Sequence, residues 1–244
     1  MAGEEIKIIT ADGTVPARVF GPKGTPGIVL YMDIFGPREA LWEMAERIGS
    51  WGYRVLVPDL FYRIGAYGPF DAATAFQDEA KKKELFALKN ATPPSLVAED
   101  TGAFLDALVA HGATAPFGAV GYCMGGPCAL VAAAAYPVRI VVAASLHGGN
   151  LASEDEDSPH HLADRMKALI YVGTAEDDHS FPPEQSGRLA LALRTAKTDH
   201  IIENYPGTTH GWCVADHGAY HRDGAERHWR RLAQLFAEKL YPEG

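Results

Sequence analysis

A cysteine between glycines is the side chain of this sequence best suited to nucleophilic chemistry. The stretch GYCMGG at residues 121–126 follows an apolar run and precedes an alanine-rich one. This is the pattern of a nucleophile elbow, a strand-to-helix turn in which bulky neighbours of the nucleophile would collide. The start of the following helix would favour a thiolate at Cys123, and the Met124 N–H is available to a developing oxyanion. The alternative is that Cys123 is a small buried side chain in a glycine-rich turn.

A cysteine nucleophile needs a base, and the base needs a carboxylate to orient it. His210 follows the last apolar run in YPGTTHGW, and we predict that it is the base. The preceding loop, YVGTAEDDHSFPP, offers Glu176, Asp177 and Asp178. Many α/β hydrolases carry this aspartate four residues before a proline. That spacing selects Asp178 through Pro182 and leaves Asp177 as the second choice. The chain order of nucleophile, acid and histidine is that of α/β hydrolases.

The other cysteines and most of the histidines lack such a context. Cys128 and Cys213 form no CxxC pair or even-numbered framework with Cys123, so the sequence indicates reduced thiols rather than a zinc site or disulfides. We interpret Cys128 and Cys213 as core thiols. Five histidines are predicted to be solvated, in polar loops or on helix faces: His160, His161, His217, His221 and His228.

Short apolar runs alternate with helical patterns, which indicates parallel strands joined by crossover helices. The predicted strands lie at 27–32, 53–58, 117–122, 140–146, 168–173 and 200–205. Apolar residues repeat at helical spacing within 38–52, 96–112 and 222–240. We therefore predict a single α/β-hydrolase domain over residues 1–244, with a mostly parallel central sheet and helices on both faces.

Two segments do not fit this alternation. Residues 63–95 begin with glycines and aromatics and end at Pro-Pro. We expect them to form an excursion over the carboxyl edge of the sheet, where α/β ligand sites open. Residues 150–161 are polar and acidic. Their carboxylates and paired histidines are compatible with a metal site, but a solvated loop is the favoured interpretation.

Composition narrows the class of partner. The formal net charge of −9 argues against nucleic acids and anionic membranes, which select clustered lysine and arginine. The N-terminal stretch MAGEEIKIITADG lacks the basic and apolar regions of a signal peptide, and no apolar run is long enough to span a bilayer. We expect a cytoplasmic protein that acts on a small molecule as a monomer or small homo-oligomer.

These motifs resemble the dienelactone hydrolase family of α/β hydrolases almost end to end. The resemblance rests on MDIFGPRE, GYRVLVPDLFYR, GYCMGG, the aspartate loop and THGW, of which GYCMGG with its cysteine is the most specific. It implies hydrolysis of a lactone or ester by a triad of Cys123, His210 and Asp178, without a cofactor or metal. It also implies an oxyanion hole formed by the N–H groups of Met124 and Ile34.

Two features depart from the family pattern. A glutamate precedes IFG in the family and is thought to hold or take the thiol proton, whereas this chain has the shorter Asp33. Asp33 has a second interpretation, as a residue that caps or braces its loop. Family members also bind a substrate carboxylate with arginines, and Val214 stands at one of these positions. Lys81, Lys82 and Lys83 in the excursion offer charge, although an ordinary solvated helix face is favoured.

The sequence thus predicts a hydrolase that cleaves an ester or lactone through a covalent acyl-enzyme on cysteine. One alternative is a broad-specificity carboxylesterase, with a larger ester bound under the excursion. Another is a redox-sensing or ligand-binding protein that retains the elbow, because a reactive thiol also reacts with peroxide. A purely structural module would leave the ordered catalytic loops unexplained.

Overall fold

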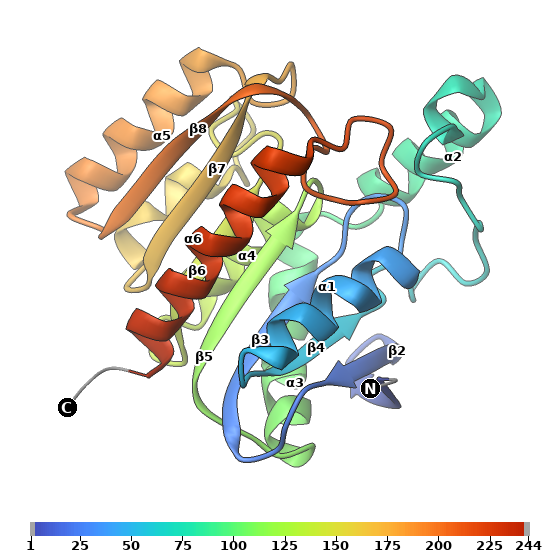
Figure 1. The fold of residues 1–244 in the computed structure, drawn as a ribbon, viewed down its shortest axis with the longest axis vertical. Helices are drawn as coiled ribbons and strands as arrows, with labels where there is room; N and C mark the ends of the chain where they lie inside the picture. The colour runs from blue at the N-terminus through green and yellow to red at the C-terminus, as the bar shows by residue number, and fades with distance from the viewer. Residues whose placement is uncertain (1–2, 242–244) are drawn as a thin grey trace.

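Six parallel strands form the centre of a single sheet. They are β3 (Thr25–Tyr31), β4 (Arg54–Pro58), β5 (Ala113–Tyr122), β6 (Ile140–Leu146), β7 (Leu169–Asp177) and β8 (His200–Thr209). The computed structural model describes residues 3–241. Each of the six predicted strands is present, so the prediction of a mostly parallel α/β sheet is confirmed (Figure 1).

A hairpin of β1 (Glu4–Thr10) and β2 (Gly13–Phe20) extends the sheet at one edge. β1 pairs antiparallel with β2, and β2 pairs antiparallel with β4, which gives the order β1-β2-β4-β3-β5-β6-β7-β8. The sequence did not predict these two strands. Pro16 lies within β2 and cannot donate a ladder hydrogen bond, which weakens the strand signal there.

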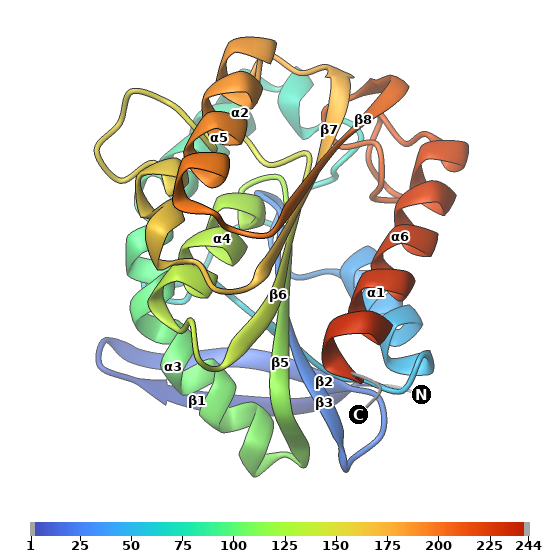
Figure 2. The ribbon, with the colours of Figure 1, turned by 90° about the vertical axis from the view of Figure 1, so that its left-hand side faces the viewer.

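Five helices cover the two faces of the sheet. Figure 2 shows α1 (Glu39–Ser50) and α6 (Arg222–Leu240) on one face, and α3 (Pro94–Ala110), α4 (Gly125–Ala135) and α5 (Pro183–Ala196) on the other. The apolar stripes predicted for α1, α3 and α6 are buried against the sheet. α5 was not predicted, because Gly187 interrupts its helical pattern.

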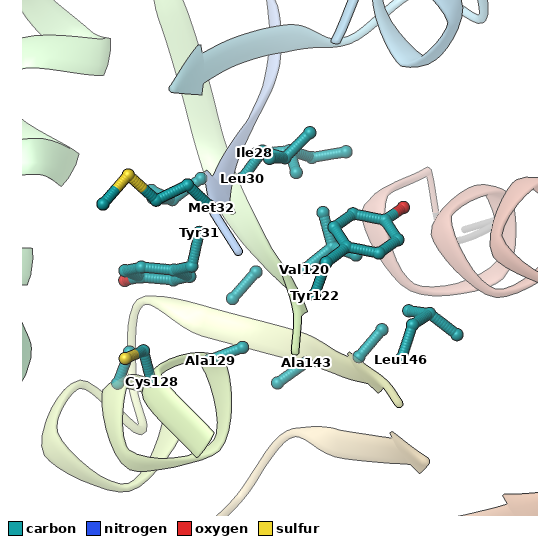
Figure 3. Packing of buried hydrophobic residues seen from close by; sticks show 14 of the residues in the cluster. Ile28, Leu30, Tyr31, Met32, Val120, Tyr122, Cys128, Ala129, Ala143 and Leu146 are labelled. Atoms are coloured by element: carbon teal, nitrogen blue, oxygen red, sulfur yellow. The ribbon is translucent and has the colours of Figure 1, made fainter. Parts of the chain in front are cut away.

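On one face of the sheet, α4 packs mainly on β5 and β6 (Figure 3). Nearly every residue of α4 is buried, and its small alanines let the helix lie close to the strands. Tyr31 is fully buried on this side, and its hydroxyl is 2.8 Å from that of Thr101 on α3. Tyr122, the last residue of β5, is buried on the opposite side with its hydroxyl 3.4 Å from His228 Nε2. The neighbouring strands β3 and β5 are therefore anchored to opposite faces of the sheet at their carboxyl ends.

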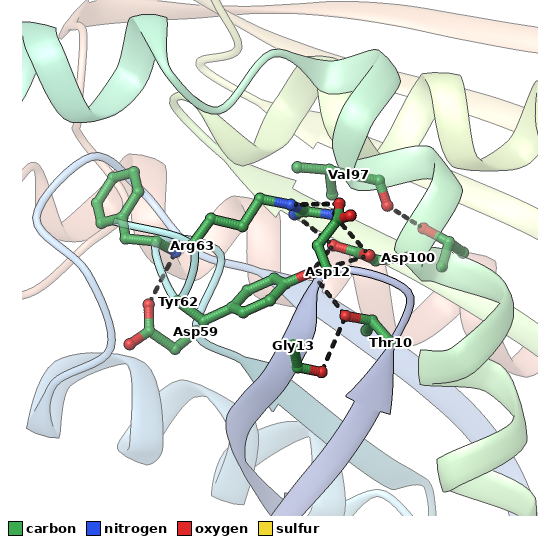
Figure 4. A network of polar contacts seen from close by, with 10 residues as sticks. Thr10, Asp12, Gly13, Asp59, Tyr62, Arg63, Val97 and Asp100 are labelled. Atoms are coloured by element: carbon green, nitrogen blue, oxygen red, sulfur yellow. Dashed lines mark hydrogen bonds and ion pairs between the residues drawn. The ribbon is translucent and has the colours of Figure 1, made fainter. Parts of the chain in front are cut away.

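The segment between β4 and α3 leaves the sheet at an anchored point. Figure 4 shows the guanidinium of Arg63 between Asp100 of α3 and Asp12 of the hairpin. Asp100 also accepts a hydrogen bond from Tyr62. These contacts join α3, the hairpin and the start of the predicted excursion.

Beyond this anchor, the segment carries a short 3-10 helix (Ala75–Gln77) and α2 (Glu79–Asn90). α2 lies past the carboxyl ends of the strands (Figure 1). Lys81 and Lys83 are exposed on it and Lys82 is partly exposed, as expected for a solvated helix face. Within residues 3–241, no helix is long and apolar enough to cross a membrane.

Candidate active site

The candidate catalytic side chains all follow directly on strands of the sheet. Cys123 comes after β5, Asp178 after β7 and His210 after β8. Because these strands are parallel and carry their carboxyl ends at one edge, residues far apart in the sequence meet there. All three side chains line one cavity of about 470 Å³.

Cys123 lies on a sharp turn that only glycines permit. Its φ is +53°, in the left-handed region that a non-glycine residue seldom adopts. A Cβ on Gly121 would lie 1.8 Å from the Gly125 carbonyl oxygen, and a Cβ on Gly125 would lie 2.3 Å from that of Tyr31. The predicted collision at positions 121 and 125 is therefore confirmed, and Cys123 is held partly exposed at the cavity wall.

The imidazole of His210 is oriented by Asp178. Its Nδ1 lies 2.8 Å from Asp178 Oδ2. The other carboxylate oxygen, Oδ1, accepts the Ser180 N–H at 2.9 Å and the Ser180 hydroxyl at 2.6 Å. This Asx turn fixes the carboxylate, and the sequence analysis overlooked Ser180 although an Asp-X-Ser spacing is its signal. Asp177 and Glu176 are exposed, and Glu176 accepts the Gly207 N–H instead.

The electrostatics of this group favour a charged imidazole. Burial lowers the pKa of His210, but the electrostatic interaction and hydrogen bond with Cys123 and the contacts with Asp178 outweigh burial and raise it to about 10. Burial also opposes ionisation of Asp178, yet its bonds to His210 and Ser180 leave its pKa below the ordinary value. The surroundings of His210 therefore favour its charged form.

Asp33 is engaged by an arginine. Its Oδ1 accepts the Phe35 N–H at 3.0 Å and Arg38 Nη1 at 2.7 Å, while Oδ2 accepts Arg38 Nη2 at 2.9 Å. Arg38 in turn donates to both oxygens of Asp216, in the loop after His210. The carboxylate of Asp33 is buried and lines the cavity. Of its two predicted roles, these bonds favour the brace.

Two backbone N–H groups at the cavity wall lack a protein acceptor. Ile34 and Met124 both line the cavity. Within residues 3–241, neither N–H donates a hydrogen bond to another group. Unpaired N–H groups facing a buried site are the requirement for an oxyanion hole.

The predicted excursion supplies an aromatic wall to the cavity. Phe76 packs edge-on against Phe35 at 5.4 Å between ring centroids, and Phe86 of α2 packs on Phe76 at 6.0 Å. Lys89, also on α2, lines the cavity, and no other lysine or arginine of residues 3–241 does so. The cavity is thus mainly apolar, with Lys89 adding a cationic side chain to its wall.

His147, His179 and His217 line the cavity without having been assigned to it from the sequence, and His228 was misplaced. His147 follows β6, is 1% exposed and contacts the backbone of Cys123. Its only sequence signal is its position after a buried strand. His228 was predicted to be solvated, but it is 0% exposed between Tyr122 and Trp229, because it lies on the sheet-facing stripe of α6. This prediction was wrong.

The remaining predictions concern the other two cysteines and the acidic loop at residues 150–161. Cys128 and Cys213 are buried, which confirms them as core thiols. The acidic residues Glu154, Asp155, Glu156 and Asp157 are exposed, as expected for a solvated loop. No group of three or more histidine, cysteine or acidic residues suited to a metal ion occurs within residues 3–241.

Comparison with known proteins agrees with this architecture. The model of the dienelactone hydrolase family matches residues 15–240. A carboxymethylenebutenolidase of Rhodococcus opacus is 27% identical over 219 residues, which cover 87% of this chain and 81% of the relative. A Synechocystis protein whose name includes carboxymethylenebutenolidase is 26% identical over 224 residues, covering 88% of this chain and 87% of the relative. A Klebsiella pneumoniae crystal structure whose name includes dienelactone hydrolase superposes with a TM-score of 0.84 at 23% identity, over 97% of this chain and 98% of that one.

Proposed function

This chain belongs to the dienelactone hydrolase family, a family of hydrolases, and on that premise we propose that it cleaves a carboxylic ester or lactone through Cys123. The observation that carries the proposal is the juxtaposition of three strand ends: Cys123 on a strained turn, His210 charged beside it, and Asp178 2.8 Å from His210 Nδ1. A thiolate paired with an imidazolium is the activated form of a cysteine nucleophile.

The first step forms the acyl-enzyme. The Cys123 sulfur attacks the carbonyl carbon, and the carbonyl oxygen becomes an oxyanion that accepts hydrogen bonds from the Ile34 and Met124 N–H groups. Each such donor is worth about 3 kcal/mol in comparable sites. When the tetrahedral intermediate collapses, the bond to the leaving oxygen breaks and His210 gives that oxygen its proton.

The second step regenerates the enzyme. Neutral His210 takes a proton from water, and the resulting hydroxide attacks the thioester carbonyl. Collapse of this intermediate breaks the carbon–sulfur bond and returns Cys123 as a thiolate beside protonated His210. Asp178 holds the Nδ1 tautomer throughout and stabilises the charged ring. The mechanism uses neither a metal nor a cofactor.

His210, and not Asp33, takes the thiol proton in this mechanism. Both carboxylate oxygens of Asp33 already accept from Arg38, which would have to be released before Asp33 could act as a base. Asp33 instead bends the loop after β3 by accepting the Phe35 N–H, which places the neighbouring Ile34 N–H at the cavity.

The cavity favours a compact substrate with an apolar or aromatic part. Phe76 and Phe86 offer ring surface, and Lys89 has no acidic partner within residues 3–241. A carboxylate on the substrate would therefore find its counter-charge at Lys89 rather than at the three exposed lysines Lys81, Lys82 and Lys83. Val214 is fully buried and cannot take part in such binding.

The test is a parallel kinetic assay with p-nitrophenyl acetate and a dienelactone, which carries a carboxylate. We expect the wild type to turn over both and Cys123→Ala to turn over neither. Lys89→Gln is expected to raise KM for the dienelactone about tenfold, the effect of losing one charged contact, and to leave KM for the neutral ester unchanged. Activity on the ester alone would indicate a broad carboxylesterase, and silence on both would support a sensor or binding protein.

A further inference from the structure

His147 stands directly behind the proposed nucleophile, where the mechanism assigns it no task. We propose that His147 is a positioning residue: its neutral ring holds the Cys123 turn from behind and fixes the face that His210 presents to the thiol. The inference rests on the proposed function, because it concerns the same pair. Its evidence is a backbone hydrogen bond, two ring contacts and a strained, buried conformation.

The hydrogen bond joins the side chain of one strand end to the main chain of the next. Because Tyr122 of β5 is paired with Leu146 of β6, Cys123 and His147 follow at matching positions. The Cys123 N–H is 3.1 Å from the Leu146 carbonyl oxygen and 3.1 Å from His147 Nδ1. Nδ1 must therefore be an acceptor, which places the ring proton on Nε2.

This bond holds a residue in an unfavourable conformation. Cys123 has φ +53° and His147 itself has φ +38°, and such values persist only where the surroundings enforce them. The Cys123 N–H is directed towards β6, and the next N–H, that of Met124, has no acceptor at the cavity wall among residues 3–241. His147 thus acts on the oxyanion hole as well as on the sulfur.

The ring of His147 also forms one wall for His210. Their centroids are 5.1 Å apart at an interplanar angle of 65°, and Trp212 packs on His147 at 5.1 Å and 72°. Trp212 is fully buried and fixes the outer side of His147. A shift of the His147 ring would therefore allow the His210 ring to tilt away from the thiol.

The ring is kept without its full set of hydrogen bonds. Within the described chain, His147 Nε2 is buried and has no partner. A buried polar group left unpaired is unfavourable, so an apolar residue of similar shape would serve packing better. The retained Nδ1 acceptor gives the imidazole a task that such a residue would lack.

The charges around His147 keep it neutral. Burial lowers its pKa, and the nearby charges of His210, His217 and His228 lower it further. The other ionisable groups that face it are Cys123 and Tyr122, whose ring centroid lies 6.1 Å away. A neutral His147 can accept from the Cys123 N–H and does not repel the imidazolium of His210.

Three variants separate positioning from packing. His147→Asn keeps an acceptor near the place of Nδ1 and tolerates a positive φ. His147→Gln keeps an amide but places it one bond further out, and His147→Leu removes the acceptor. His228→Leu is the matched control, because His228 is an equally buried histidine that touches neither Cys123 nor His210.

The readouts are kcat, KM, the melting temperature and the pH profile of Cys123 alkylation by iodoacetamide. We expect His147→Leu and His147→Gln to lose about 100-fold in kcat, with KM little changed and a shifted alkylation profile, as for a small misplacement of reacting groups. His147→Asn should recover roughly a tenth or more of wild-type kcat. His228→Leu should lower only the melting temperature.

Two results would overturn the inference. One is a His147→Gln or His147→Leu enzyme that melts earlier but keeps the wild-type kcat and alkylation profile. The other is an Asn variant as impaired as the Gln variant. Failure of the proposed function is distinct, since the wild type would then turn over neither substrate, or Cys123→Ala would retain turnover, whatever residue stands at 147.

Discussion

Asp178 holds the ring of His210, whereas its neighbour Asp177 does not, and the difference arises from strand geometry. Asp177 is the last residue of β7 and is exposed, while Asp178 lies beyond the strand with its side chain 2% exposed. Because the strand ends at Asp177, the chain turns there and only Asp178 contacts His210. Ser180 then locks the carboxylate through its N–H and hydroxyl.

Replacing this carboxylate should therefore abolish most activity. We expect Asp178→Asn to lower kcat on the order of 10⁴-fold, because the amide cannot hold His210 in the productive tautomer. Asp177→Asn is the matched control and should stay near wild type. Steady-state rates on p-nitrophenyl acetate measure both. A larger loss in Asp177→Asn than in Asp178→Asn would refute the assignment.

The charge on His210 is open to direct titration. Its pKa of about 10 lies above the ordinary value of 6.5, because its interactions with Cys123 and Asp178 outweigh the lowering effect of burial. NMR titration should show this value in the wild type and a marked fall in Cys123→Ala. Because the folded-state pKa is the higher one, its stabilisation of the fold is complete below pH 6.5 and is lost as the pH rises through about 10. A wild-type titration near 6.5 would contradict the ion pair.

The sequence was sufficient to select the three residues that we propose to carry the chemistry, and insufficient for the residues that support them. Cys123, His210 and Asp178 follow from residue type, neighbouring glycines and chain order. His147 and Arg38 do not, because their partners lie on other strands or loops and no local pattern marks the contact. His228 was placed wrongly because it is a polar residue on the buried stripe of α6.

At the scale of elements, the turn between β5 and α4 depends on a close approach of backbone to backbone. Gly121→Ala places a Cβ 1.8 Å from the Gly125 oxygen, a clash that only a backbone shift relieves. We expect a loss of more than about 4 kcal/mol in unfolding free energy, or no folded protein. Gly118→Ala is the control on the same strand, since its nearest contact would be 3.3 Å.

Urea denaturation of the two glycine variants checks this expectation. Gly118→Ala should cost about 1–2 kcal/mol, because its apolar side-chain neighbours can move slightly. Equal stability of the two variants would mean that the elbow tolerates a side chain at 121, and the account of its glycines would be wrong.

The central strands of the sheet are easier to predict from the sequence than the elements at its edges. β5 and β6 are buried on both faces and read as continuous apolar runs. β1 alternates weakly, β2 contains Pro16, and α5 contains Gly187, so none of the three carries a clear period. These three elements form because they pack or pair at the edge of the sheet. Such contacts with distant residues leave no pattern in the local sequence.

At the scale of the molecule, Arg38 links two loops that are 178 residues apart in the sequence. It bridges Asp33, in the loop after β3, and Asp216, beyond His210. Arg38→Met leaves Asp33 buried and unpaired, and we expect it to cost about 3–5 kcal/mol in unfolding free energy. Arg18→Met, which breaks a pair with the exposed Glu5, should cost no more than about 1 kcal/mol.

Denaturation curves of the two arginine variants, recorded at low and high salt, compare the pairs. The Arg38 pair is largely buried, so its contribution should vary little with salt, whereas the Arg18 pair should be screened. If Arg38→Met proved no more costly than Arg18→Met, Arg38 would not brace the two loops.

The central claim is that the substrate's acyl group is carried on Cys123. The most direct measurement is mass spectrometry of the wild-type enzyme, quenched in acid during turnover of p-nitrophenyl acetate, with peptide mapping of the adduct. We expect one added acetyl group on Cys123 of the wild-type enzyme, and none when His210→Gln is treated in the same way. Turnover with no adduct on Cys123 at any quench time, or an acetyl group that forms on another residue and decays at the rate of turnover, would contradict it.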